Sequence, residues 1–407
     1  MIKIAKIGLY GMFLNYYPFQ IMFGRFIPGG TYIFFAMIVL GILGDAIYKH
    51  DGKIGIDQEN FFWLLYLLLA LLTSVFALST SYAISALIKY AMRLFVIIAV
   101  TYICEKDKSI LFAIQLLAIT ASLSAFTAFI QMGDLHGRLT LKSGASISIN
   151  DFGSIMVYGC FAVIPFFRYL HFKNEFLKIA LTMGISVLLV VELFVSGSRK
   201  GFYAIIIFYA LMLLFVWVKM DGRIRIGKAL GIIVVAGVVI YIANRYLLPN
   251  MEETSLYQRI WGEDAESAAL SDEGRKDLYS LAMKEFFLNP VTGLGFDNFS
   301  YKYQGYTHST YVEPLACSGL IGLLYLIPYV KVLIDQFKLV LAERKWKIES
   351  KWETELLIFY VAFLFIAIGI PYMYKDFPCI VLGMLIAHHH IEQDEKIGWI
   401  QREEIGT

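Results

Sequence analysis

Arg199 and its neighbours are suited to hold an anionic group. Arg199 lies in a Ser-Gly-Ser-Arg-Lys-Gly turn at 196–201, between two apolar stretches and beside Lys200. Gly197 and Gly201 allow the backbone to approach a ligand closely. A guanidinium also offers a planar pair of donors that suits phosphate better than an ammonium does. Two interpretations stay open: an anion site, or a basic side chain that keeps its charge in water at a membrane edge.

Arg275 is the second candidate anion ligand. It lies in the first turn of a helix predicted over 272–288, where the helix dipole disfavours a cation. Either an ion pair with Asp272 or Glu273, or a bound phosphate, would stabilise it there. Tyr279, on the same predicted helix, is a candidate substrate-binding residue.

His308 is the candidate base, since histidine can accept a proton near neutral pH. It stands at the expected start of an apolar helix, where a histidine can also serve only as an interfacial hydrogen-bonding residue. Glu313 lies five residues later, about 140° around an ideal helix, so the spacing does not bring the two side chains together. We expect Tyr311 and Glu313 to bind substrate.

Charged residues inside apolar segments form a second group of candidates. Lys89 and Arg93 lie one helical turn apart, and Glu192 lies in another apolar segment. Such charges usually face a cavity or one another. The alternatives are therefore an internal ion pair with Glu192 and a polar pocket in which Lys89 and Arg93 bind substrate.

The sequence gives little support for a metal or redox site. The three consecutive histidines 388–390 point in different directions around a helix. The cysteines are far apart with no C-x-x-C spacing, so we expect them to be small buried hydrophobic residues. We expect no metal and no cofactor. The cysteines are Cys104, Cys160, Cys317 and Cys379.

Membrane-spanning helices must position these residues. Hydrophobic residues make up 58% of the 407 and charged residues 17%, and the apolar runs approach the roughly 20 residues that cross a bilayer. The predicted fold class is all-α: a polytopic membrane helix bundle of about 12 transmembrane helices with one long external loop containing short helices. The near-balanced charge of +2 argues against a nucleic-acid partner. The runs are 5–23, 30–48, 60–79, 82–104, 109–131, 152–169, 177–195, 201–218, 227–248, 310–335, 353–373 and 376–388.

The expected organisation follows from these runs. Residues 1–248 form helices 1–9, 249–307 the external loop, 308–390 helices 10–12 and 391–407 a cytoplasmic tail. The loop helix at 272–288 has one apolar face, with Leu278, Leu281, Ala282 and Phe286. Because about sixty residues form only a marginal core, we expect the loop to pack on the helix ends.

The short loops give the orientation. Lys and Arg collect in one alternating set of them, which the positive-inside rule assigns to the cytoplasm together with both termini. Three polar stretches then share the outer side: 137–151, which includes the candidate substrate-binding residue Arg138, then 196–201 and 249–307.

Three motifs in this order resemble the O-antigen ligase and polymerase superfamily of bacterial membrane glycosyltransferases. They are SGSRKG at 196–201, GRKDLY at 274–279 with NPVTGLGF at 289–296, and HSTYVE at 308–313 followed by GLIG at 319–322. The resemblance covers roughly 177–329. The N-terminal half is similar to the family only in hydropathy and in its 138–151 loop.

The resemblance implies an inverting, metal-independent enzyme in the bacterial cytoplasmic (inner) membrane. It would transfer an undecaprenyl-diphosphate-linked glycan to a hydroxyl on the outer face. By that analogy Arg199 and Arg275 hold the diphosphate, and His308 orients or deprotonates the acceptor. Fixed cations suit a departing diphosphate on electrostatic grounds as well.

The leading hypothesis is polymerisation of lipid-linked repeat units into O-antigen or capsular polysaccharide. HSTYVE is similar to the polymerase branch, and the interval from Arg275 to His308 is short for a ligase. The alternatives are a ligase that transfers polysaccharide to lipid A-core, and a flippase or transporter, for which internal repeats and broken helices would be expected. Membrane lipids and the lipid-linked glycan are the expected partners, with a chain-length regulator protein as a further candidate.

Overall fold

The computed structural model describes residues 1–24, 26–48, 57–131, 148–170, 173–212, 214, 219–220, 223–224, 255–260, 262, 265–346 and 353–405. Within these ranges the regular secondary structure is helical except for one two-residue antiparallel pairing, which confirms the all-α class. The first half comprises α1 (Ile2–Leu14), a π-helical turn (Asn15–Phe19), α2 (Gln20–Phe23), α3 (Gly30–Tyr48), α4 (Gln58–Thr73), a 3-10 turn (Ser74–Phe76), α5 (Thr80–Asp107), α6 (Leu111–Gln131), α7 (Ile149–Tyr169), α8 (Glu175–Ser196) and α9 (Arg199–Met212).

The second half contains the two short strands and the remaining helices. They are β1 (Lys219–Met220), β2 (Arg223–Ile224), α12 (Ser255–Ile260), α13 (Ala265–Leu288), α14 (Asn298–Tyr303), α15 (Glu313–Ser318), a 3-10 turn (Gly319–Ile321), α16 (Gly322–Trp346), α17 (Glu353–Ala367), a 3-10 turn (Tyr372–Tyr374) and α18 (Phe377–Ile405).

Seven helical segments of the described chain are long and apolar enough to cross a membrane. The expected total of about 12 is therefore confirmed only in part, and the predicted run 227–248 lies outside the described residues. Three predicted boundaries are wrong. The tenth helix begins at Glu313 and is broken at Gly319, the eleventh ends at Ala367, and the twelfth continues to Ile405 through most of the predicted tail.

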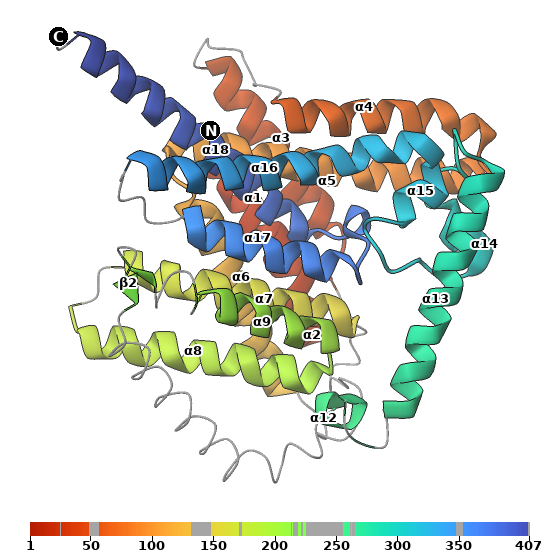
Figure 1. The fold of residues 1–407 in the computed structure, drawn as a ribbon, viewed down its shortest axis with the longest axis horizontal. Helices are drawn as coiled ribbons and strands as arrows, with labels where there is room; N and C mark the ends of the chain where they lie inside the picture. Colours follow the sequence, from red (N-terminus) through yellow and green to blue (C-terminus); the bar gives the residue numbers. More distant parts are fainter. Residues whose placement is uncertain are drawn as a thin grey trace.

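The helices form a bundle whose one end is crossed by the loop (Figure 1). Helices α4, α5 and α16 lie toward one side and α7, α8 and α9 toward the other, while α13 runs steeply across the ends of the bundle helices. Deep in the bundle, Phe161 of α7 stacks on Phe359 of α17, with ring centroids 3.9 Å apart. This packing fixes α7 and α17 beside α9, where the first arginine lies.

The predicted loop helix is confirmed and begins earlier, at Ala265. Its apolar face packs as expected: Ala282 is buried, and Leu278 and Leu281 pack with it in a small cluster at the bundle end. The turn after α13 is tied to α15, because Leu294 N donates to Ala316 O (3.1 Å) and Gly295 N donates to Cys317 O (2.8 Å). The loop therefore packs on the helix ends.

Close backbone contact explains one loop glycine. Gly293 has φ +62°, and a Cβ there would lie 2.4 Å from the carbonyl carbon of Cys317. Only glycine avoids both that conformation's penalty and this overlap. All four cysteines are free and buried, as predicted.

Candidate active site

Arg199 is placed by a tight turn between α8 and α9. Helix α8 ends at Ser196, Gly197 adopts the left-handed conformation (φ 69°), and Arg199 begins α9. Ser196 Oγ accepts a hydrogen bond from Ser198 N at 3.2 Å, which caps the turn. Gly153 of α7 lets the turn approach closely, since a Cβ there would lie 2.3 Å from Ser198 Cβ.

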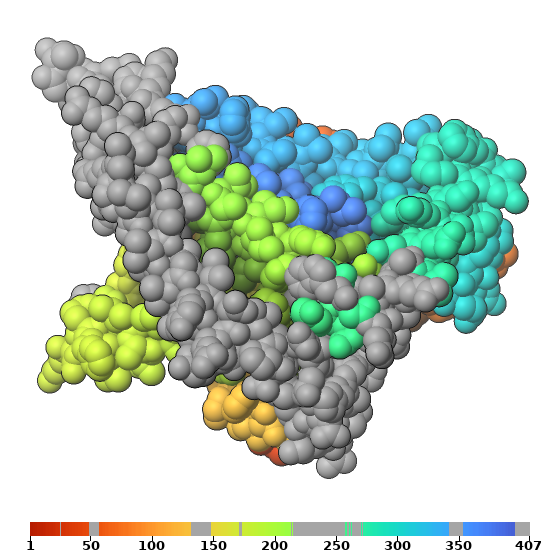
Figure 2. Space-filling view, turned by 60° about the horizontal axis from the view of Figure 1, so that its bottom comes forward, coloured from red at the N-terminus to blue at the C-terminus, as the bar shows by residue number. Residues whose placement is uncertain are grey.

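Asp272 joins the two arginines. Arg199 NH2 lies 2.9 Å from Asp272 Oδ2, and Arg275 NH1 lies 2.8 Å from Asp272 Oδ1. The predicted Arg275–Asp272 pair is thus confirmed and includes a residue from α9. Figure 2 shows α9 and the loop segment meeting on one face of the molecule. Because the Asp272 side chain is 45% exposed, each pair adds only about 0–1 kcal/mol of stability; its main effect is to orient two guanidinium groups.

A cavity of about 200 Å³ lies at this junction, lined by both arginines, Asp272, Lys200, Asn150, Tyr203 and Phe365. Burial, and then the nearby Arg275, lower the pKa of Lys200 to about 8, although Asp272 opposes the change. Lys200 is still mainly protonated at pH 7. The cavity thus has three cations and one carboxylate in its lining, which favours a doubly charged anion.

The sequence suggested that His308 begins a helix, but it lies in the loop before α15. Its φ is +56°. Its side chain is half-buried. Burial, and then the charges of Arg275, Lys200 and Lys375, together lower its pKa to about 4. At neutral pH the imidazole is therefore uncharged and has a lone pair that can accept a proton.

Glu313 fixes the loop that contains His308. Its side chain is fully buried, and its Oε2 accepts hydrogen bonds from Thr307 N and Thr307 Oγ1, both at 2.7 Å. Tyr374 OH donates to its Oε1 at 3.3 Å. A carboxylate so enclosed positions the backbone next to His308 and does not reach the cavity.

The two predicted substrate-binding tyrosines anchor the site to the end of α17. Tyr311 OH donates to Leu364 O at 2.8 Å, and Tyr279 OH donates to Ile368 O at 3.0 Å. Both side chains are partly exposed. Each hydroxyl keeps acceptor capacity for a sugar hydroxyl.

Comparison with known families gives a match to part of the chain. Residues 184–327 match the family model described as O-antigen ligase, and we call this segment the O-antigen ligase domain. The match supports the resemblance to the O-antigen ligase and polymerase superfamily, whose members are membrane enzymes of the glycosyltransferase type. A search of the curated proteins found no match.

The O-antigen ligase domain contains Arg199 and Arg275, which line one cavity, and His308, on which the charge of Arg275 acts. Lys89 and Arg93 lie outside it. The interpretation of an ion pair with Glu192 is wrong: Arg93 Nε contacts Asp376 Oδ1 at 2.8 Å. Within the described chain, neither carboxylate oxygen of Glu192 has a hydrogen-bond partner. Arg138 lies outside the described residues.

Sequence reasoning missed Lys375 as a contributor to the site. Its Nζ lies 2.6 Å from Asp151 Oδ2 on α7, and its charge lowers the pKa of His308. The available signal was a charged pair, Lys375 and Asp376, between two apolar runs. Away from the O-antigen ligase domain's cavity, Glu353, His388 and Glu392 have ligand atoms within 4.8 Å of one another, so one residue of the histidine tract has acidic neighbours.

Proposed function

We propose that this protein polymerises undecaprenyl-diphosphate-linked oligosaccharide repeat units into O-antigen or capsular polysaccharide. The reaction would take place on the outer face of the cytoplasmic membrane. The observation that supports it most is the convergence of Arg199, Arg275 and Lys200 on one cavity beside an uncharged His308. The HSTYVE motif and the short interval from Arg275 to His308 favour the polymerase branch.

The proposed transfer is a single displacement. An acceptor hydroxyl attacks the anomeric carbon from the face opposite the diphosphate, and a new C–O bond forms. The bond from that carbon to the diphosphate oxygen breaks, and the electron pair leaves with the diphosphate, so the configuration inverts. The hydroxyl proton passes to a ring nitrogen of His308. Arg199, Arg275 and Lys200 stabilise the charge that develops on the leaving group, and the scheme needs no metal.

Donor binding should also strengthen the base. In the empty site burial, and then the charges of Arg275, Lys200 and Lys375, lower the pKa of His308 to about 4. A bound diphosphate would offset the charges of Arg275 and Lys200, so the pKa of His308 should rise. A histidine with a higher pKa is a better base at neutral pH. The acceptor is therefore activated when a donor is in place.

The family match supports a second candidate, because its description is O-antigen ligase. A ligase would transfer finished polysaccharide from the same carrier to lipid A-core. The same cations would hold the diphosphate, and His308 would face a core sugar. The two functions differ in the acceptor and not in the leaving group.

Reconstitution separates these functions. Purified protein in liposomes receives only undecaprenyl-diphosphate repeat units, and products are resolved by size. A polymerase gives a ladder of longer lipid-linked glycans, and His308→Ala should flatten it. Glycan that appears on added lipid A-core with no lengthening of the donor would reject the polymerase proposal and support the ligase.

A further inference from the structure

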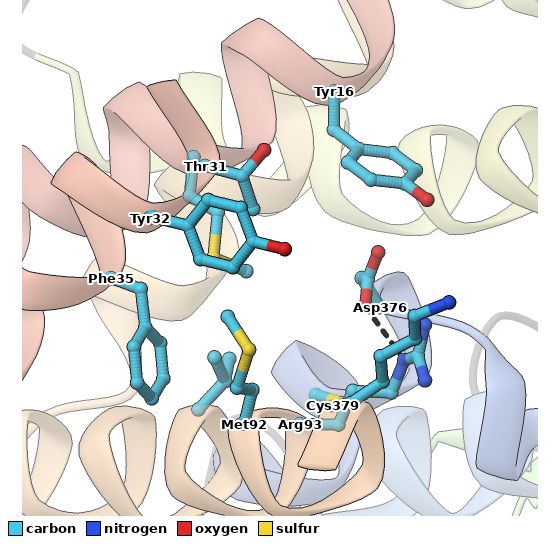
Figure 3. A pocket seen from close by; sticks show the side chains of 11 residues that line it. Tyr16, Thr31, Tyr32, Phe35, Met92, Arg93, Asp376 and Cys379 are labelled. Carbon is cyan, nitrogen blue, oxygen red and sulfur yellow. Dashed lines mark hydrogen bonds and ion pairs between the residues drawn. The ribbon is translucent and has the colours of Figure 1, made fainter. Parts of the chain in front are cut away.

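A second cavity, drawn in Figure 3, lies outside the O-antigen ligase domain. It has a volume of about 230 Å³ and is lined by residues of α1, the π-helical turn, α3, α5, α18 and the residue before α18. Figure 3 shows Tyr16 and Tyr32 over a space whose floor includes Arg93 and Asp376. Nothing in the reaction described above uses this cavity.

Arg93 is fixed at the cavity floor and keeps unused N–H hydrogen-bond donors. Its Nε donates to Asp376 Oδ1 at 2.8 Å and its NH1 to Met373 O at 3.5 Å. A guanidinium has five N–H donors. Arg93 makes these two hydrogen bonds with described residues, so three of its N–H donors remain for a ligand. The Asp376 pair fixes the orientation of the planar fork, as a phosphate site requires.

Lys89 supplies a second cation. It lies one turn before Arg93 on α5, lines the same cavity, and is exposed. No described residue forms an ion pair with it. Two like charges at this spacing destabilise a helix by a few tenths of a kcal/mol. Asp376 is the one carboxylate in the lining; Asp297 lies within electrostatic range of both cations but outside it. An anion in the cavity would relieve the repulsion.

Much of the remaining lining is apolar and includes Met12, Phe35, Met92 and Val96. Met12 and Val96 are buried, and Phe35 and Met92 are partly buried. Tyr32 of α3 is 71% exposed, and Ile88, next to Lys89 on α5, is 59% exposed. In a membrane protein such surface meets lipid tails. The cavity thus has a cationic floor and lies beside exposed apolar surface of α3 and α5, a combination that suits an amphiphile with an anionic head.

The two cavities lie on either side of one short segment. Asp376 contacts Arg93 in the second cavity, and the adjacent Lys375 contacts Asp151 near the first and acts electrostatically on His308. A molecule whose phosphate sits on Arg93 therefore has the transfer site as its neighbour.

We propose that this cavity binds the phosphate head group of a second lipid, the acceptor, which enters from the membrane between α3 and α5. Its volume is below the roughly 300 Å³ at which pockets begin to enclose drug-sized ligands. It therefore holds the phosphates and the start of the tail, and leaves the glycan outside. That the lipid is an acceptor rests on the proposed polymerase function. That the cavity binds a lipid phosphate does not.

Binding stoichiometry tests the proposal. The full chain in phosphatidylcholine nanodiscs is titrated with radiolabelled undecaprenyl diphosphate. We expect two lipids per wild-type chain, one for Lys89→Glu, one for Arg275→Ala, and none for the double variant. Lys173→Glu, the same charge change at an exposed residue elsewhere, should still bind two. One lipid per wild-type chain, or two for Lys89→Glu, would overturn the proposal.

Further arms identify the ligand and exclude misfolding. In Arg275→Ala, unlabelled inorganic pyrophosphate or phosphatidylglycerol should not displace the remaining lipid; displacement by either would show a general phosphate or anionic-lipid site and reject an acceptor site. Lys89→Gln, which removes the charge without reversing it, should weaken the second binding event at least tenfold and keep the thermal unfolding midpoint. Unchanged binding by this variant would also reject the proposal.

The two proposals can fail separately. Loss of the second lipid in Lys89→Glu without any ladder from the wild type would reject polymerisation and leave the second site. A wild-type ladder together with two lipids bound by Lys89→Glu would reject the second site and leave polymerisation.

Discussion

Asp272 pairs with both Arg199 and Arg275, where the proposed function would place a phosphate oxygen. Its charge repels the diphosphate, so Asp272→Asn should lower the KM for the lipid-linked donor. Since the side chain is 45% exposed, the change in unfolding free energy should stay below about 1 kcal/mol.

Steady-state kinetics and thermal unfolding of the same preparations check both expectations. Asp277→Asn, an exposed residue on the same helix, is the matched control and should leave KM unchanged. A higher KM for Asp272→Asn would show that the carboxylate assists donor binding and does not compete with it.

The pKa of His308 predicts a difference between two pH profiles. The free enzyme needs neutral His308, whose pKa is about 4, so kcat/KM should fall only as the pH drops toward 4. In the donor complex the His308 pKa should be higher, because the diphosphate offsets the nearby cations, so kcat should fall at a higher pH than kcat/KM does. Coincident acid limbs, or unchanged limbs in His308→Gln, would contradict the proposed coupling.

At the level of residues, the motifs pointed to Arg199 and Arg275, which line one cavity, and the nearby acid Asp272 was visible in the sequence as a partner. The role of His308 stays a prediction. The Arg93–Asp376 pair was not. Its members lie 283 positions apart, and only helix packing brings α5 to α18. Glu192 was chosen as the partner for its charge alone, which says nothing of the direction in which its helix faces.

At the level of elements, the contact between α7 and the α8–α9 turn sets the position of Arg199. Gly153→Ala would place a Cβ 2.3 Å from Ser198 Cβ, so the turn must move. A shift of about 1 Å can cost on the order of a hundredfold in rate, and we expect a loss of this size in kcat.

Gly184→Ala is the matched control, because a Cβ at this α8 position meets no atom within 4 Å. It should keep wild-type activity. Equal activity of both variants in the liposome assay would mean that the turn tolerates displacement and that the arginine is not held as tightly as the contact implies.

Element boundaries were harder to predict than element types. The apolar run after His308 suggested one continuous helix, but Thr310 N donates to Ala367 O and Thr310 Oγ1 to Ile370 O. These bonds hold the chain in a loop until Glu313. Ser and Thr side chains compete with helical hydrogen bonding in this way, yet a hydropathy pattern does not record which backbone they will meet.

For the whole molecule, the Lys and Arg asymmetry predicts that α13 is external and the loop before α8 cytoplasmic. Both Ser280 of α13 and Glu175 of α8 are exposed. A membrane-impermeant thiol reagent should label Ser280→Cys in intact spheroplasts and Glu175→Cys only after lysis. The native cysteines are buried, so the background should be low. The opposite pattern would reverse the orientation and place the transfer site inside the cell.

The class of the whole molecule followed directly from composition, since long apolar runs admit few structures other than membrane helices. The number of spans did not. Helix α17 has 15 residues, fewer than the roughly 17–25 that usually cross a bilayer, although hydropathy alone predicted a full-length run there.

The central claim is that Arg199 and Arg275 act together on one leaving diphosphate. A single-turnover assay in liposomes, with the donor in limiting amount, measures release of undecaprenyl diphosphate from wild type, Arg199→Ala, Arg275→Ala and the double variant. Each single variant should lose on the order of a hundred- to thousandfold in rate, and the double variant much less than the product of the two losses, because the residues work as a unit. Lys in place of either Arg should restore part of the rate. Near-wild-type release from either Ala variant would contradict the claim.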